Sequence, residues 1–301
     1  LIEGMFDHLA VAAAGNGGQS LGNTAAAPSS TTITLVNASD AHNFNVGMVL
    51  VASIGDGSST SDALLGSGAT ATVTAVNRSA GTLTINSNPA SWAGAGAGIY
   101  LFREDVFYGN TTSFLMHGVR SYIAGTATPP EVYGMSAATR ATDPVRLGGG
   151  WLQSADVAGK DIESRLQLML SYQTGRWRAK GPFEIWMHPE DWQNLAIALQ
   201  SRGQRPLKDD STSFGYMYLE VIGGGAMAKI FADPFFLKGT AFSLSMKTFE
   251  LLSMRDLIHP LNNDGFKMLR KSDSDDYEFR AVSYPGLGNN APGFSARVPV
   301  A

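Results

Sequence analysis

The chain has 301 residues, of which 44% are hydrophobic and 16% charged, and its formal net charge at pH 7 is −4. This length and apolar fraction are typical of one large or two ordinary globular domains and exclude wholesale disorder. The negative net charge argues against a protein that grips nucleic acid through its whole surface, although locally basic patches stay open. Because the chain has no cysteine, disulfides, thiolate metal sites and cysteine nucleophiles are excluded. The sequence has no run of about 18 apolar residues, so it predicts no transmembrane helix and no membrane partner.

The N-terminal segment, residues 1–28, is interpreted as the end of a helix followed by a linker. Apolar residues recur at helical spacing up to Gly15, which suits a helix C-terminus. Residues 16–30 are rich in Gly, Ser, Asn, Thr and Ala, a composition that predicts a flexible connection. The segment lacks the basic region of a signal peptide, and it does not begin with Met. Either a processed N-terminus or a longer chain fits this start.

Residues 29–108 are predicted to form a separate β-rich domain. Short β-prone runs are separated by Gly, Ser, Asn and Asp, and they cover 32–36, 46–53, 69–76, 81–85 and 98–102. The third and fourth runs, joined by the sequence NRSAG, predict a hairpin. About five strands in so short a segment favour a small barrel or sandwich. Arg78 is the only Lys or Arg among the first hundred residues, so we expect a neutral, hydroxyl-rich surface.

Residues 109–158 contain Pro129, Pro130, Pro144 and three consecutive glycines at 148–150, and are expected to be a winding connection. A helix follows at 158–174. Its predicted buried side contains Ile162, Leu166, Met169, Leu170 and one of Tyr172 or Gln173, and Gly175 is expected to end it.

The sequence FEIWMHPEDWQNLAIALQ, residues 183–200, predicts a strand that runs directly into an amphipathic helix. Apolar residues at 183, 185 and 187 alternate as in a strand with one buried face. Pro189 suits the first helical position, and Glu190 and Asp191 suit the first turn, where the helix dipole favours negative charge. Trp192, Leu195, Ala196 and Leu199 then form one apolar stripe.

The C-terminal part is predicted to be α+β. Residues 201–214 are polar and charged and are expected to be a surface loop. A mostly antiparallel set of strands follows, and it covers 216–223, 227–234, 240–246, 249–254, 266–271 and 277–284.

No catalytic, cofactor or metal site is expected. The five histidines lie in five different segments, so none has a metal-ligand spacing to a neighbour. The acidic cluster Asp273, Asp275, Asp276 and Glu278 lacks the spacing of a calcium loop, and a solvated or salt-bridged loop is favoured over cation binding. The glycines at 94, 96 and 98 precede a strand, which favours turn glycines over a phosphate loop.

The sequence RWRAK, residues 176–180, is the one cluster of basic and aromatic residues. Such a cluster can contact phosphates and stack on bases. It is also what a helix end looks like, because cations there suit the dipole, and this second interpretation is favoured.

The order of these parts resembles the C-terminal two thirds of a tailed-bacteriophage major capsid protein, over residues 105–300. The resemblance rests on a helix, then an apolar strand leading into MHPEDW, a charged loop and a strand pair ending in ADPF at 232–235. TAFSLSMKTFELLSM, a DGF turn at 264–266, DSDDYEFRAVSY and a closing APGFSARVPV complete the series.

The resemblance implies a capsid fold in which 159–235 form the axial domain and 236–301 supply strands of the peripheral domain, with 109–158 as a connection within the latter. Residues 1–28 would contain the end of the spine helix, and 29–108 would be an inserted β domain. The loop after residue 200 would lie near the local symmetry axis. We therefore expect inter-subunit contacts from five of its residues: Arg202, Arg205, Lys208, Asp209 and Asp210.

The function implied by the resemblance is that of a structural protein, not an enzyme. It would assemble as hexamers and pentamers into an icosahedral shell around double-stranded phage DNA, held without sequence specificity. The virion would be its location after assembly in the bacterial cytoplasm, and decoration, portal and scaffolding proteins its further partners. The N-terminal arm and extended loop of the family are not within these residues, so lacing through them is not carried over. A bacterial nanocompartment shell of the same fold, or a module that binds glycans or a host surface through the β domain, stays an alternative.

Overall fold

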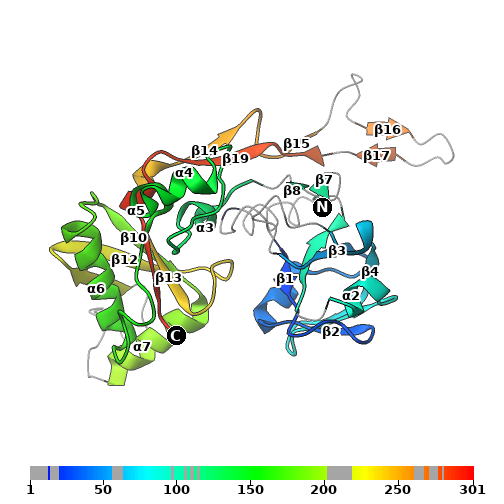
Figure 1. Ribbon diagram of the computed structural model, residues 1–301, viewed down its shortest axis with the longest axis horizontal. Helices are drawn as coiled ribbons and strands as arrows, with labels where there is room; N and C mark the ends of the chain where they lie inside the picture. Colours follow the sequence, from blue (N-terminus) through cyan, green and yellow to red (C-terminus); the bar gives the residue numbers. More distant parts are fainter. Residues whose placement is uncertain are drawn as a thin grey trace.

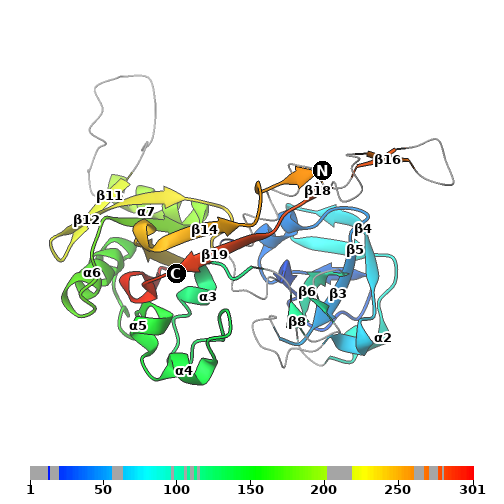
Figure 2. The same cartoon turned by 90° about the horizontal axis from the view of Figure 1, so that it is seen from above.

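The computed structural model describes residues 13, 20–55, 64–95, 98–104, 107–108, 112–113, 116–201, 219–260, 268–270, 277–279 and 281–301. Its α-helices are α2 (Ala90–Ala93), α3 (Val119–Tyr122), α4 (Ala137–Ala141), α5 (Pro144–Gly148), α6 (Ile162–Gly175) and α7 (Pro189–Ser201). Short 3₁₀ helices are η1 (Ala38–Asn43), η2 (Leu65–Ser67), η4 (Met246–Thr248) and η5 (Pro292–Phe294). The described segments form a β-rich body, an α/β body and a long two-stranded arm (Figures 1 and 2).

The β-rich body is a six-stranded antiparallel barrel. Its strands are β1 (Gly22–Asn23), β2 (Thr32–Thr34), β3 (Val49–Ser53), β4 (Ala71–Asn77), β5 (Thr82–Ile85) and β6 (Tyr100–Arg103), in the spatial order β1-β6-β3-β4-β5-β2. The two end strands join each other. The N–H of Ala25 donates to the Thr34 carbonyl at 2.9 Å, and the N–H of Val36 donates to the Asn23 carbonyl at 2.8 Å. Because the sheet closes on itself, it leaves no unpaired edge.

The barrel has its own hydrophobic core. Trp92, Phe44 and Leu101 are fully buried there beside aliphatic residues from every long strand. The predicted hairpin over β4 and β5 is present, and the observed strands are one to three residues shorter than predicted. The expectation of a flexible connection over 16–30 is wrong for Leu21 to Thr24, because Leu21 is buried and β1 pairs with β6.

The α/β body is built on a second six-stranded sheet. Its strands are β9 (Gly150–Trp151), β10 (Phe183–Met187), β11 (Leu219–Gly223), β12 (Ala226–Ala232), β13 (Thr240–Leu244) and β20 (Ala296–Pro299), in the order β11-β12-β10-β13-β20-β9. Only the pairs β10–β12 and β20–β9 are parallel, so the predicted mostly antiparallel arrangement is confirmed. Helices α6 and α7 cover one face of this sheet (Figure 1).

The two long helices follow the sequence closely. Gly175 is the last residue of α6, and Leu166, Met169 and Leu170 form its buried side as predicted. Of the two alternatives left open, Gln173 is the buried one. Its amide donates to the Phe294 carbonyl at 2.8 Å and to the Ser243 carbonyl at 3.3 Å, and so joins α6 to the far end of the chain.

The segment expected to be a winding connection contains three short helices, α3, α4 and α5, arranged around Arg140. This side chain is only 1% exposed, and burial lowers its pKa to about 10. Its guanidinium donates to the carbonyls of Ser121 at 2.9 Å, Tyr122 at 3.1 Å and Leu147 at 3.0 Å, and to that of Pro130. One buried arginine therefore satisfies four backbone acceptors, which holds this irregular segment in place.

The arm is one long hairpin. Its paired strands are β14 (Phe249–Ser253) with β19 (Pro285–Asn289), β15 (His259–Pro260) with β18 (Ala281–Val282), and β16 (Met268–Arg270) with β17 (Tyr277–Phe279). The three sections lead away from the α/β body one after the other (Figures 1 and 2). A further short pair, β7 (Phe107–Tyr108) with β8 (Thr112–Ser113), follows the barrel.

The observed architecture is a mixed α/β one with several sheets, which is compatible with the predicted α+β class. Among the helices described, none is long and apolar enough to cross a membrane.

Candidate assembly surfaces

The first candidate surface is built around the start of α7. Strand β10 ends at Met187, and the carbonyl of His188 accepts the N–H of Trp192 at 3.0 Å as the first hydrogen bond of the helix. The His188 ring also accepts at Nδ1 the N–H of Glu190, at 3.3 Å. Pro189 occupies the first helical position, where its missing N–H leaves no bond unmade. The predicted strand-to-helix unit is therefore confirmed.

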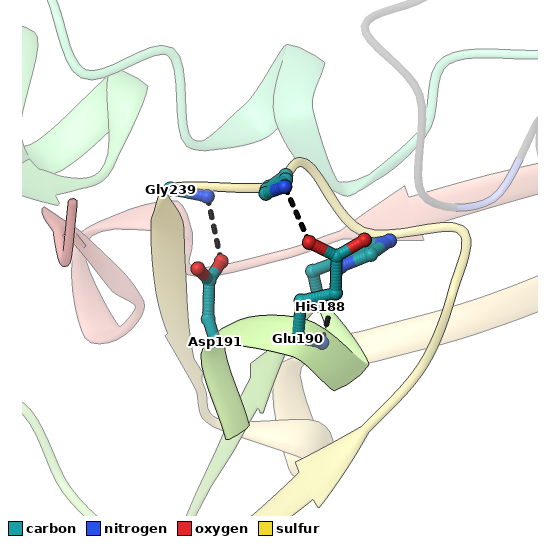
Figure 3. A network of polar contacts seen from close by, with 5 residues as sticks. His188, Glu190, Asp191 and Gly239 are labelled. Carbon is teal, nitrogen blue, oxygen red and sulfur yellow. Dashed lines mark hydrogen bonds and ion pairs between the residues drawn. The ribbon is translucent and has the colours of Figure 1, made fainter. Parts of the chain in front are cut away.

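The loop 233–239, between β12 and β13, is fastened to this helix start (Figure 3). The buried carboxylate of Asp191 accepts the N–H of Gly239 at 2.6 Å. Glu190 forms an ion pair with Lys238, which lowers the pKa of the Glu190 carboxyl through the hydrogen bond and the positive charge of the ammonium. The two acidic residues of the first turn thus hold a neighbouring loop, in addition to facing the helix dipole.

Aromatic packing against the sheet also holds the loop 233–239 in place. Phe236 is buried and stacks on Trp186 of β10, with ring centroids 5.7 Å apart. Trp186 also stacks on Phe231 of β12 at 5.1 Å, and Phe236 contacts Phe242 of β13 at 5.5 Å. The helix that leads to residue 201 is therefore anchored at its N-terminus by hydrogen bonds, an ion pair and stacked rings.

The five residues expected to contact other subunits lie outside the described residues, since 202–218 are not described. The expectation for Arg202, Arg205, Lys208, Asp209 and Asp210 stays a prediction. The structure shows which elements flank this segment: helix α7 ends at Ser201 and strand β11 begins at Leu219.

Apolar residues are exposed on the elements next to this segment. Ile197 on α7 is exposed, and Ile222 of β11 lies directly opposite Met227 of β12 with both side chains in solvent. Ile222 and Met227 are on the face of the sheet that α6 and α7 do not cover, whereas Ile197 is on the side of α7 that faces away from the core.

The second candidate surface is the arm. Leu251 is 52% exposed, Leu252 59% and Met254 86%. Successive residues of a strand point to opposite faces, so the ribbon exposes apolar side chains on both. Met268, Tyr277 and Tyr284 extend this exposure along the arm. The consecutive leucines Leu251 and Leu252 break the alternation of a half-buried strand, and this pattern in the sequence indicates apolar side chains on both faces. The prediction of a strand over 249–254 did not include that exposure.

The other sequence motifs have structural explanations where the structure describes them. Gly94 follows the short helix α2, and Gly224 and Gly225 have positive φ in the turn between β11 and β12. Asp273, Asp275 and Asp276 lie outside the described residues, and nothing is described of the side chain of Glu278. Within the described ranges, no group of three or more His, Asp or Glu side chains could hold a metal ion.

No protein-family model matches the chain, and a search of curated proteins found no match either.

Proposed function

We propose that this chain is a structural shell protein, a major capsid protein of the tailed-phage type that assembles as hexamers and pentamers around double-stranded DNA. The observation that carries the proposal is the arm. A two-stranded ribbon is marginally stable alone in water, and this one exposes large apolar side chains on both faces. Contacts with further copies of the chain would bury those side chains.

The ordered series of parts in the sequence supports the same proposal. Its strand-to-helix unit is anchored at the helix start, which suits a scaffold that presents the 202–218 segment to neighbouring subunits. Repeated contacts between different surfaces of identical chains close into rings when the rotation between them permits. An acidic, weakly charged container also suits DNA that must be packed and released.

The experiment is electron microscopy and sedimentation of the purified protein. The proposal expects closed particles or ring-shaped capsomers. A protein that stays monomeric under all conditions of salt and concentration contradicts it. Particles that enclose a cargo protein and no nucleic acid favour the nanocompartment alternative.

A charge reversal tests the predicted axis contacts. Arg205→Glu is expected to reduce assembly by about tenfold at low salt, because Asp209 or Asp210 of a neighbouring copy would then face a like charge and not an arginine. Lys160 is exposed on the α/β body, and Lys160→Glu, which makes the same charge change there, is the control. Unchanged assembly of the Arg205 variant counts against the axis placement.

A glycan-binding role for the barrel has one observation in its favour. Thr32 pairs with Thr84 and Thr34 with Thr82, and these side chains are exposed or half-buried on its outer face. Such a face offers hydroxyl donors and acceptors without charge. A glycan array with the purified protein tests this role, and the absence of any bound glycan removes it.

A further inference from the structure

One end of the α/β body presents a group of cations that belong to neither candidate assembly surface. We call it the basic patch, and it consists of Arg176, Arg178, Lys180 and Lys247, all exposed. The first three alternate along the chain with half-buried Trp177 and buried Ala179, so they lie on the outward side of this segment. Lys247 comes from η4, and the hydroxyl of Ser245 donates to the Lys180 carbonyl at 3.3 Å, which brings the two segments together.

In the part of the chain that the structure describes, no carboxylate neutralises the positive charge of the basic patch. None of its four cations forms an ion pair with a described carboxylate, whereas Lys238 does so with Glu190. In a chain whose formal net charge is −4, this is a local excess of positive charge.

The backbone under the patch is held firmly. The N–H of Ala179 donates to the Gln173 carbonyl at 2.8 Å, and the guanidinium of Arg176 lies 4.0 Å above the Tyr172 ring. Trp177 packs edge-on against Tyr172 and lies on Gly150, where even a Cβ atom would overlap its ring. Because the indole is half-buried against Gly150 and Tyr172, it offers little surface on which a base could stack. Contact with a nucleic acid would therefore reach phosphates and not bases.

The helix dipole explains only part of this arrangement. A cation at Arg176 suits the C-terminus of α6, but the dipole effect falls off within the last turn. Lys180 and Lys247 lie outside any α-helix. Both are exposed and form no ion pair with a carboxylate among the described residues, so they are available to a ligand outside the chain.

We propose that the basic patch binds the phosphate backbone of double-stranded DNA without reading its sequence. The inference rests on the proposed function in one respect, since it assigns this end of the α/β body to the side of the shell that faces the DNA. Binding itself is a property of the unassembled chain, and it is measured separately from assembly.

The test uses fluorescence anisotropy of a 30-base-pair DNA duplex with unassembled protein from 50 to 300 mM NaCl. Four phosphate contacts predict a slope of log affinity against log salt of about −3 to −4. Arg178→Gln with Lys180→Gln removes two contacts and should bring the slope about two units closer to zero, equally for duplexes of different sequence. Lys160→Gln with Arg255→Gln makes the same charge change at exposed positions elsewhere and should leave it unchanged.

Three outcomes overturn the inference. One is equal loss in the patch and control pairs, which reduces the effect to net charge. Another is tighter binding of polyglutamate than of the duplex, which makes an acidic protein segment the ligand. The third is no binding of either probe at 50 mM NaCl.

The charge-conserving pair Arg178→Lys with Lys180→Arg should keep the wild-type slope, and it separates a lost contact from a folding defect. Wild-type protein that forms shells but does not bind the duplex contradicts only this inference, and wild-type protein that binds the duplex but forms no shells contradicts only the proposed function.

Discussion

The barrel and the arm are both made of antiparallel strands, yet the barrel closes its sheet around a buried core and the arm leaves apolar side chains exposed. The barrel closes through the hydrogen bonds between β1 and β2 and buries Trp92, Phe44 and Leu101. The arm keeps two strands and leaves Leu251 and Leu252 in solvent on opposite faces. The barrel completes its own core within the chain, whereas the arm leaves large apolar side chains exposed, which we propose that other copies of the chain cover.

If the proposed function holds, this difference separates residues that stabilise the fold from residues that contact other copies of the chain. Core residues of the barrel should affect stability strongly and assembly only indirectly. Apolar residues of the arm should affect assembly strongly and the stability of the isolated chain very little, because surface substitutions away from special features change it by less than about 0.5 kcal/mol.

The largest effect is expected from Trp92→Ala, which breaks the barrel side of the comparison. The indole is fully buried in the barrel core, and such truncations cost about 3 to 5 kcal/mol. If the barrel is a self-contained unit, thermal unfolding followed by calorimetry should show one transition moved down or lost and another unchanged. A single transition that moves as a whole contradicts independent folding of the two bodies.

Asp191→Ala tests the α/β body in the same experiment. The half-buried N–H of Gly239 loses its charged acceptor, which costs about 2 kcal/mol, and only the α/β transition should fall. Glu190→Ala, which removes the exposed ion pair with Lys238, is the control and should have a smaller effect that fades in 0.5 M salt. Equal effects of the two variants would mean that burial of Asp191 does not matter.

Asp40 gives the barrel a pH dependence. Burial raises the pKa of its carboxyl from 3.8 to about 6, against the opposing effects of the Asn37 hydrogen bond and the Arg120 charge. The folded state then holds the proton more tightly than the unfolded state. Its contribution to stability is fully present below about pH 4 and is lost as the pH rises to about 6.

Asp40→Asn should therefore stabilise the barrel transition at pH 7.5 by about 1 to 2 kcal/mol and flatten its change between pH 4 and 6. Exposed Glu104 lies at the end of the barrel, and Glu104→Gln is the control. An Asp40 variant that keeps the wild-type pH profile refutes the assignment to this carboxyl.

The sequence predicted the elements whose local preference and burial pattern agree. Pro189, the acidic first turn and the apolar stripe of α7 all indicate the same helix, and the structure has it at Pro189–Ser201. It did not predict β1, because two residues make a strand only through pairing with β6, almost eighty positions away. Closure of the barrel depends on contacts of the same kind.

Buried polar residues were predicted only in part, since periodicity left Gln173 as one of two alternatives and gave no indication of Arg140. Gln173 is in the core because its amide reaches two carbonyls on other elements, and Arg140 because it reaches four. No periodic pattern contains this information. The two candidate surfaces differ in the same way, since charged loop residues can be recognised locally, whereas the exposure of Leu251 and Leu252 arises because no described element packs over these side chains.

The most direct test of the account compares assembly of the arm variant Leu251→Ser with Leu252→Ser and of the barrel control Val36→Ser with Ile54→Ser. All four side chains are large, apolar and more than half exposed. Sedimentation velocity of the purified proteins, with melting temperatures measured alongside, should give shells or capsomers for the wild type and the control and small species for the arm variant. All three proteins should melt within a few degrees of one another. An arm variant that assembles as the wild type does would contradict the role given to the arm.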